Sequence, residues 1–309
     1  MPRKVDLAAL PPIHGTWRAV SEWLTGFRPG ADELMRAAAW SPVFSAQSFA
    51  PGRPELEDLW SSGGHVSWLG GPAAHPLSEW PRDVDGLPLA HVVTLCLADV
   101  AGASDEAGKI GWPDRREGLP THGVLEVFHD LQTYGWEPAD GARGGWLVRW
   151  VPAPERGGLA EPPSDLETPT ELCQAGLLLP GFSLPCSLDL DAPAARGPEA
   201  DAAFDVAEEV TEQVQRAWLL QQTGSAVGHP VPVTHVYGHS QNGARAVAEI
   251  LDAVLPCGPG DSHRLVLDVE SWTHLAGWFG DAEPLEVWMR DSDLAEQRFD
   301  AAWCLIRSD

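Results

Sequence analysis

The segment Gly238-His239-Ser240-Gln241-Asn242-Gly243 contains the residue types of a nucleophile elbow, the sharp strand-to-helix turn that presents the catalytic serine of many hydrolases. An extended run over residues 230–237 precedes this segment, and a helical pattern begins directly after it. In chain order, Asp268 and His274 follow Ser240 and could act as the acid and the base of a triad. The pattern therefore admits a serine hydrolase.

An ordinary strand-to-helix turn explains the same segment better. The elbow requires glycine two residues after the serine, and this chain has Asn242 there, although asparagine tolerates a positive φ better than most residues. The chain after Ser240 is short, and the chain before it lacks the regular alternation of strands and helices found in hydrolase sheets. We therefore expect no catalytic residue and keep Ser240, Asp268 and His274 as the alternative.

Metal and phosphate sites are not expected. His235 and His239 are four residues apart, but the run that contains His235 has extended character, which places the two side chains roughly 13 Å apart. That distance is too long for one zinc ion with bonds of about 2.0–2.1 Å. The glycine-rich segment 141–145 precedes a strand, whereas a phosphate-binding loop opens a helix. We expect no cofactor.

Two segments place tryptophan beside acids and are candidates for binding a partner, because tryptophan is enriched at binding hot spots. The chain has 15 tryptophans, and many adjoin glycine or proline, so packing of the rings in the core is the competing explanation. The candidate partner-binding residues are Trp80, Asp83 and Asp85 in one segment and Trp278, Asp281 and Glu283 in the other.

The charge balance bears on the kind of partner. The chain has 20 basic and 45 acidic side chains, a formal net charge of −25. Nucleic-acid binding requires clustered lysine and arginine, so this class is excluded. An acidic surface attracts basic proteins, although the same charge could serve solubility alone.

Composition and processing signals favour a cytoplasmic protein. Apolar residues make up 44% of the 309 residues, enough for one large domain or two intimate ones. The five cysteines are an odd number and widely scattered, as expected for reduced thiols. The first residues lack the apolar core of a secretory signal, and no apolar run reaches the length of a membrane helix.

The periodicity predicts a mixed fold. Residues 1–60 are predicted to be an N-terminal helical extension, with helices at Trp17 to Phe27 and Ala31 to Trp40. Residues 152–200 are rich in proline, glycine and acids and are predicted to be a long connection, partly packed as irregular structure. The remaining predicted strands are 92–97, 123–128, 146–151 and 265–269, and the remaining predicted helices are 199–222, 244–255 and one beginning near Asp293.

One sequence unit occurs twice. Leu125-Glu126-Val127 in the first half resembles Leu285-Glu286-Val287 in the second, and a strand-like run ending in an acid precedes each. Chance recurrence of short strands is the alternative to duplication. We expect an α+β fold with an internally duplicated, largely antiparallel sheet and flanking helices. The predicted domain spans 61–309, with pseudo-repeats at about 61–151 and 225–309.

Several longer motifs resemble the YwqG-like family, a domain of unknown function (number 1963). They are Ser67-Trp68-Leu69-Gly70-Gly71-Pro72, the segment from Glu79 to Leu89, Gly123 to Asp130, Leu265 to Ser271, Trp278 to Asp281, and Asp291 to Asp300. The resemblance covers about residues 60–305. The segment Val236-Tyr237-Gly238-His239 through Gln241 is similar to a non-catalytic segment of the family, and Thr94-Leu95-Cys96-Leu97 departs from the family's usual Gln-Ile-Asp-Leu.

The resemblance implies an α+β fold with a repeated sheet and no established enzyme activity, cofactor or catalytic residue. Members are often encoded near polymorphic toxins, which suggests an immunity-type role. The leading hypothesis is therefore an acidic cytoplasmic protein that binds and neutralises a cognate toxin, possibly a basic one. The alternatives are a serine hydrolase at Ser240 and a non-enzymatic scaffold, and the oligomeric state is left open.

Overall fold

The structure is a computed structural model of the whole 309-residue chain. The residues described are 10–27, 34–35, 37–46, 53–112, 118–167, 173–189, 198–224, 233–271, 275, 279 and 283–307. No helix within these ranges has both the length and the apolar character needed to cross a membrane.

The strands are β1 (Ala39–Trp40), β2 (Val43–Ala46), β3 (Ser67–Gly70), β4 (Ala73–His75), β5 (Ala90–Cys96), β6 (Val124–His129), β7 (Trp146–Val151), β8 (Glu155–Ala160), β9 (Cys173–Leu179), β10 (Phe182–Ser183), β11 (His235–Val236), β12 (His263–Val269), β13 (Leu285–Arg290) and β14 (Trp303–Ile306). The α-helices are α1 (Trp17–Phe27), α3 (Arg53–Ser61), α4 (Leu97–Lys109), α5 (Pro138–Gly141), α6 (Pro198–Thr223), α7 (Ala248–Val254) and α9 (Asp291–Ala295). Short 3₁₀ helices are η2 (Ser187–Asp189), η3 (Arg245–Val247) and η5 (Phe299–Ala301).

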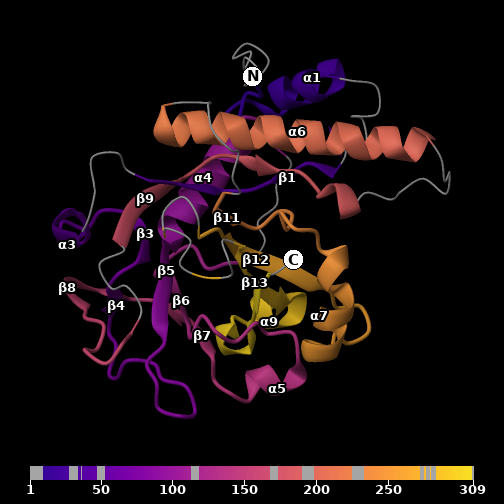
Figure 1. Cartoon of the computed structure of the whole chain (residues 1–309). Coiled ribbons are helices and arrows are strands. Elements are labelled where there is room, and N and C mark those ends of the chain that lie inside the picture. Colours follow the sequence, from indigo (N-terminus) through magenta and orange to yellow (C-terminus); the bar gives the residue numbers. More distant parts are fainter. Residues whose placement is uncertain are drawn as a thin grey trace.

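An antiparallel sheet of ten strands forms the centre of the fold (Figure 1). Its order is β14-β13-β12-β11-β2-β9-β3-β5-β6-β7, and β1–β10 and β4–β8 form two small additional pairs. Helices flank this sheet, so the expected α+β class is confirmed. Strands β2 and β9 separate a first group of strands (β3, β5, β6, β7) from a second group (β11 to β14).

The two groups pair their strands in the same way. In β5–β6 the register shifts once, between His91 and Val93, and in β12–β13 it shifts once, between Leu265 and Leu267. Counted from these shifts, the glutamates of the two Leu-Glu-Val units take corresponding positions. Glu126 lies opposite Thr94, and Glu286 lies opposite Asp268. The repeated sequence unit is therefore also a repeated strand pair.

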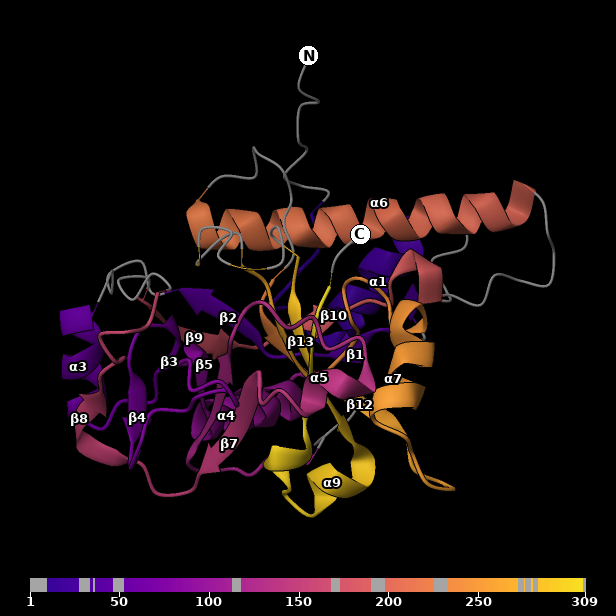
Figure 2. The ribbon, with the colours of Figure 1, turned by 60° about the horizontal axis from the view of Figure 1, so that its bottom comes forward.

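Helices α6 and α1 lie side by side across one end of the sheet (Figures 1 and 2). Helix α6 buries a stripe that recurs every four residues, the apolar face expected from the sequence: Val206, Val210, Val214 and Trp218. This stripe packs with Val20 and Leu24 of α1 and with Trp40 and Phe182 of the β1–β10 pair. The helical layer is therefore held by its own apolar core.

Two segments are extended where the sequence analysis expected other structure. The N-terminal extension contains α1 and α3, but it also contributes β1 and β2, so the helix expected to reach Trp40 ends earlier. The predicted irregular connection contains β8, β9 and β10, and β9 pairs with both β2 and β3. Gly176 permits this pairing, because a β-carbon there would lie 2.5 Å from the carbonyl oxygen of Ser45.

The two ends of the sheet are tied together by residues 134–136. Ile306 N of β14 donates to the carbonyl oxygen of Tyr134 at 3.1 Å, and the indole Nε1 of Trp136 donates back to the carbonyl of Ile306 at 3.1 Å. The indole Nε1 of Trp303 donates to the carbonyl of Gly135 at 2.7 Å. On β7, Nε1 of Trp146 donates to the carbonyl of Ala302 at 3.2 Å. These bonds connect the first and last strands of the sheet order.

Candidate functional site

The turn after β11 places Ser240 inside the protein. Tyr237 and Gly238 have φ angles of 59° and 80°, so the chain changes direction directly after the strand. A β-carbon at Gly238 would lie 2.1 Å from Oγ of Ser183, which leaves room only for glycine. The side chain of Ser240 is 1% exposed. Its hydroxyl is therefore not presented to solvent in the way that a nucleophile elbow presents it.

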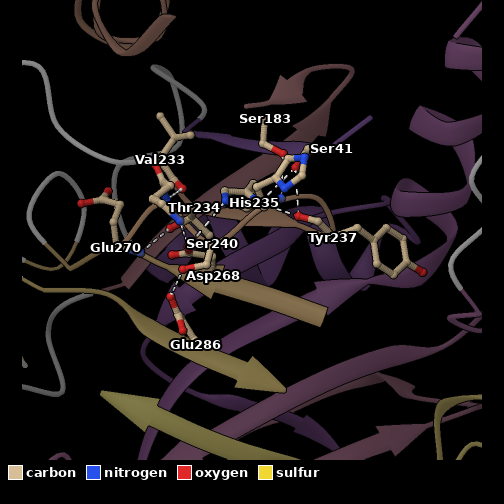
Figure 3. Close-up of polar contacts among 12 residues, drawn as sticks. Ser41, Ser183, Val233, Thr234, His235, Tyr237, Ser240, Asp268, Glu270 and Glu286 are labelled. Atoms are coloured by element: carbon tan, nitrogen blue, oxygen red, sulfur yellow. Dashed lines mark hydrogen bonds and ion pairs between the residues drawn. The ribbon is translucent and has the colours of Figure 1, made fainter. Parts of the chain in front are cut away.

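The hydroxyl of Ser240 donates to Oε1 of Glu286 on β13 at 2.5 Å (Figure 3). The other carboxyl oxygen of Glu286 accepts from Nη1 of Arg307 at 3.1 Å and from the indole Nε1 of Trp288 at 2.9 Å. Arg307 also donates to the carbonyl oxygens of Asn242 and Gly243. These bonds fasten the Ser240 turn to the second group of strands. His274, the base of the alternative triad, lies outside the described residues.

Asp268 of β12 lies beside this network and is fully buried. Its Oδ2 accepts from the backbone N of Gln241 at 3.2 Å, and its Oδ1 has no hydrogen-bond partner in the described part of the chain. Burial, and next the neighbouring Glu286 carboxylate, raise the pKa of Asp268 well above its usual value. The environment of Asp268 thus favours its protonated form.

The imidazole of His235 faces Asp268. Its Nδ1 lies 2.8 Å from the carbonyl oxygen of Tyr237, to which Nδ1–H donates, and its Nε2 lies 3.6 Å from Oδ2 of Asp268. Burial lowers the pKa of His235 to about 4, so the ring is neutral near pH 7 and its Nε2 carries a lone pair. The raised pKa of Asp268 and the lowered pKa of His235 both favour the uncharged forms, so the two side chains are disfavoured as an ion pair.

The first group of strands contains a corresponding cluster without the extra acid. Oε1 of Glu126 accepts from the backbone N of Ala74 at 2.7 Å and from Oγ1 of Thr94 at 2.9 Å, and Oε2 accepts from Nε of Arg149 at 2.7 Å. His91 lies beside them, and burial lowers its pKa. Each cluster contains a glutamate, an arginine and a histidine. They differ in the residue opposite the glutamate, which is Thr94 in the first cluster and Asp268 in the second. The second cluster is the chemically unusual one.

No group of three metal-ligating side chains gathers among the described residues. His239, one of the two histidines weighed as zinc ligands, lies with its Nε2 2.6 Å from the carbonyl oxygen of Ala37. In the buried network, Glu286 and Arg307 are fully engaged in hydrogen bonds, whereas Oδ1 of Asp268 and Nε2 of His235 have no hydrogen-bond partner among the described residues. The bonds that the network makes fix the Ser240 turn.

Most side chains of the first tryptophan–acid segment make contacts within the protein. Trp80 packs edge-on against Phe128, with ring centroids 5.4 Å apart, and donates to the carbonyl of Leu89 at 2.7 Å. Oδ1 of Asp83 accepts from the backbone N of Asp85 and of Leu87 at 2.9 and 2.8 Å, which closes the loop. Asp85 itself is exposed. Of these three predicted residues, Asp85 is the one left accessible to a partner.

The second tryptophan–acid segment is described only in part. Glu283 accepts a hydrogen bond from the side-chain Nδ2 of Asn242, so it supports the Ser240 turn. Trp278 and Asp281 lie outside the described residues.

Four exposed hydrophobic side chains on two loops were not singled out by the sequence analysis: Val84 and Leu87 on one, Tyr134 and Trp136 on the other. The four together are called here the apolar face. The backbone N of Val84 donates to the carbonyl of Arg143 at 3.1 Å, which joins the 81–88 loop to the turn after α5; Tyr134 and Trp136 precede α5 in the chain. The β4–β5 connection and α5 lie at the same end of the molecule (Figure 1). Neighbouring acids, glycines and prolines gave these residues the pattern of ordinary loops, so no sequence signal separated them from buried apolar residues.

The buried glutamates had a sequence signal that was not used. A glutamate at the centre of an apolar strand faces the core, where it requires a cation, and arginine follows in the next strand or directly after it. Glu126 with Arg149 and Glu286 with Arg307 both fit that rule.

The sequence profile of a family described as "Domain of unknown function (DUF1963)" matches residues 67–307. The chain belongs to this family. The resemblance inferred from the sequence motifs is thereby confirmed. No curated protein matches the chain. The DUF1963 match includes both buried clusters and the apolar face, and it leaves out α1, α3, β1 and β2.

Proposed function

We propose that the chain is a protein-binding module of the cytoplasm and, more specifically, an immunity-type protein that binds and neutralises a bacterial toxin. The apolar face is the observation that carries this proposal. Val84 and Leu87 are 69% and 63% exposed, and Tyr134 and Trp136 are 41% and 42% exposed. Solvent-exposed aliphatic and aromatic side chains are typical of docking sites, where tryptophan and tyrosine contribute most of the binding energy.

The charge of the protein indicates the kind of partner. Asp85 and Glu137 are exposed beside residues of the apolar face, and the whole chain has a net charge of −25. A basic partner would be attracted at long range by this charge and would then bury the apolar side chains. Members of the DUF1963 family are often encoded near polymorphic toxins, which supports a toxin as that partner.

The geometry of Ser240 supports a binding role over hydrolysis. Its hydroxyl is buried and donates to Glu286, and the turn that carries it is held by Arg307. We expect a fluorophosphonate probe to leave the folded protein unlabelled at Ser240. Labelling that disappears in Ser240→Ala would favour the hydrolase alternative.

The test uses the product of the adjacent gene as the binding partner. Binding is measured by calorimetry for the wild type and for Val84→Ser/Leu87→Ser and Trp136→Ser. We expect each variant to weaken the affinity about 10- to 100-fold, as loss of an interface anchor does. Phe204→Ser is the matched control, because Phe204 is also exposed, at 38%, but lies on α6.

Folding of each variant is checked by its unfolding transition. Unchanged affinity in the apolar-face variants, or an equal loss in Phe204→Ser, would show that this face does not bind the toxin. Absence of binding by the wild type, together with no protection of cells that produce the toxin, would refute the immunity role.

A further inference from the structure

The 81–88 loop, which belongs to the connection between β4 and β5, has a stem fixed by backbone pairing. The backbone N of Leu89 donates to the carbonyl of Pro81 at 2.9 Å, and Arg82 and Pro88 form an antiparallel β-bridge. The indole Nε1 of Trp80 donates to the carbonyl of Leu89 at 2.7 Å. The two ends of the loop are therefore held together at its base.

Asp83 orders the tip of the loop. Its Oδ1 accepts from the backbone N of Asp85 at 2.9 Å and of Leu87 at 2.8 Å, and its own backbone N donates to the carbonyl of Leu87 at 2.9 Å. Nη1 of Arg82 donates to the carbonyl of Gly86 at 2.7 Å. An aspartate that accepts from backbone N–H groups shortly after it is typical of a tight turn. The conformation of the tip is therefore set by polar groups of the loop itself.

The aliphatic side chains of this ordered tip are exposed to solvent. Val84 and Leu87 are the two most exposed large hydrophobic side chains among the described residues, and Asp85, which is also exposed, lies between them in the chain. Aliphatic side chains stabilise a fold by being removed from water, so these two contribute little to the stability of the free protein. The β4–β5 connection projects below the sheet at the bottom of Figure 1. The loop thus holds apolar side chains on an ordered protrusion.

We propose that the 81–88 loop is the part of the apolar face that enters the toxin. Val84 and Leu87 occupy an apolar cleft of the toxin, and Asp85 meets a basic group at the rim of that cleft. This inference rests on the proposed toxin binding and assigns it to one loop. A protruding loop fits a concave surface, and an exposed acid beside aliphatic side chains complements a cleft with a basic rim. Because the loop is ordered before binding, less conformational entropy is lost in the complex.

The order of the loop in the free protein is measured by amide hydrogen exchange. We expect the backbone N–H groups of Asp85 and Leu87 to exchange at least about 10-fold more slowly than in an unfolded chain. Asp83→Ala removes their acceptor and should abolish this protection. Asp83→Asn keeps a side-chain oxygen at the same place and should retain the protection. Unprotected amides in the wild type would overturn the claim that the loop is ordered before binding.

The affinity for the purified product of the adjacent gene is measured by calorimetry on the same variants. We expect Asp83→Ala to weaken the affinity about 10-fold, and Asp83→Asn to stay within about 2-fold of the wild type, because only the alanine variant releases the loop. Asp261→Ala is the matched control. Asp261 also accepts from backbone N–H groups, those of Ser262 and Ser292, but it lies on the connection between α7 and β12. An equal loss of affinity in Asp83→Asn and Asp83→Ala would show that the charge of Asp83 matters and the order of the loop does not.

Charge reversal tests the basic rim of the cleft. We expect Asp85→Lys to weaken the affinity at least about 10-fold and Glu208→Lys, the same change at an exposed position of α6, to weaken it about 2-fold. Wild-type binding with equal affinities in Asp83→Ala and Asp261→Ala, or in Asp85→Lys and Glu208→Lys, would overturn the role of this loop and leave toxin binding standing. Absence of wild-type binding would refute the proposed function and this inference with it.

Discussion

Replacing Asp268 with asparagine tests whether the buried cluster stores a proton. The side chain is fully buried, its Oδ1 has no partner among the described residues, and Glu286 lies opposite on the next strand. Asparagine keeps the shape of a protonated carboxyl group and does not titrate. We therefore expect Asp268→Asn to fold and to be more stable than the wild type at neutral and alkaline pH.

The size of the effect follows from proton linkage. Burial and Glu286 raise the pKa of Asp268 in the folded protein, whereas in the unfolded chain it is about 3.9. Between these two pKa values the folded state binds more protons than the unfolded state. The contribution of Asp268 to the wild-type free energy of unfolding is thus fully present below about pH 4. It is lost as the pH rises from there toward the pKa of Asp268 in the folded protein. The slope is at most about 1.4 kcal/mol per pH unit for one proton.

The measurement is urea unfolding of both proteins at intervals from pH 5 to pH 8. Titrating groups that do not interact with Asp268 are common to both chains and cancel in the difference, including Asp99, whose pKa burial raises to about 6. His235 stays neutral in the folded state over this range, because burial lowers its pKa to about 4. We expect the stability difference in favour of Asp268→Asn to widen with pH. Parallel curves over the whole range would refute the assignment of a stored proton to Asp268.

Two further results are expected from the same unfolding assay. Arg149→Met should cost about 3–5 kcal/mol, because it leaves the buried carboxylate of Glu126 without its cation, whereas Arg82→Met, which breaks an exposed pair, should change little. Equal losses of stability in Arg149→Met and Arg82→Met would contradict the claim that burial of the ion pair determines the cost of breaking it. Gly238→Ala should be destabilised more than Gly63→Ala: both glycines have positive φ, but only Gly238 has a neighbouring side chain within the space of a β-carbon. Similar midpoints for the two variants would show that Ser183 moves aside without cost.

Local patterns were sufficient to predict most elements of the fold. The four-residue spacing of Val206, Val210, Val214 and Trp218 predicted α6 and its buried face, and β-branched runs predicted β5, β6 and β12. The position of β9 could not be predicted in this way. Its run from Cys173 to Leu179 is apolar but contains Gly176, and the partner that requires this glycine, β2, is more than a hundred residues earlier in the chain.

The candidate site was predicted only in outline. The turn at Ser240 and its position after a strand followed from the order of residues, and Asp268, considered as the acid of an alternative triad, accepts a hydrogen bond from the residue after Ser240. The partner of the serine is Glu286, which the pattern of a catalytic triad does not include. Burial is set by tertiary packing, so the sequence did not distinguish Trp80, packed on Phe128, from Trp136, which is exposed.

The bonds between residues 134–136 and β14 also constrain the order of assembly. The carbonyl oxygens of Tyr134 and Gly135 accept hydrogen bonds from Ile306 and Trp303, which are synthesised about 170 residues later. Until the ribosome has released that last strand, the Trp303 side of the early strands stays open to water. The fold of this domain can therefore be completed only after β14 has left the ribosome, and a nascent chain stalled before residue 303 would carry β13 without its partner strand, an edge of the kind that makes incomplete folds prone to aggregation.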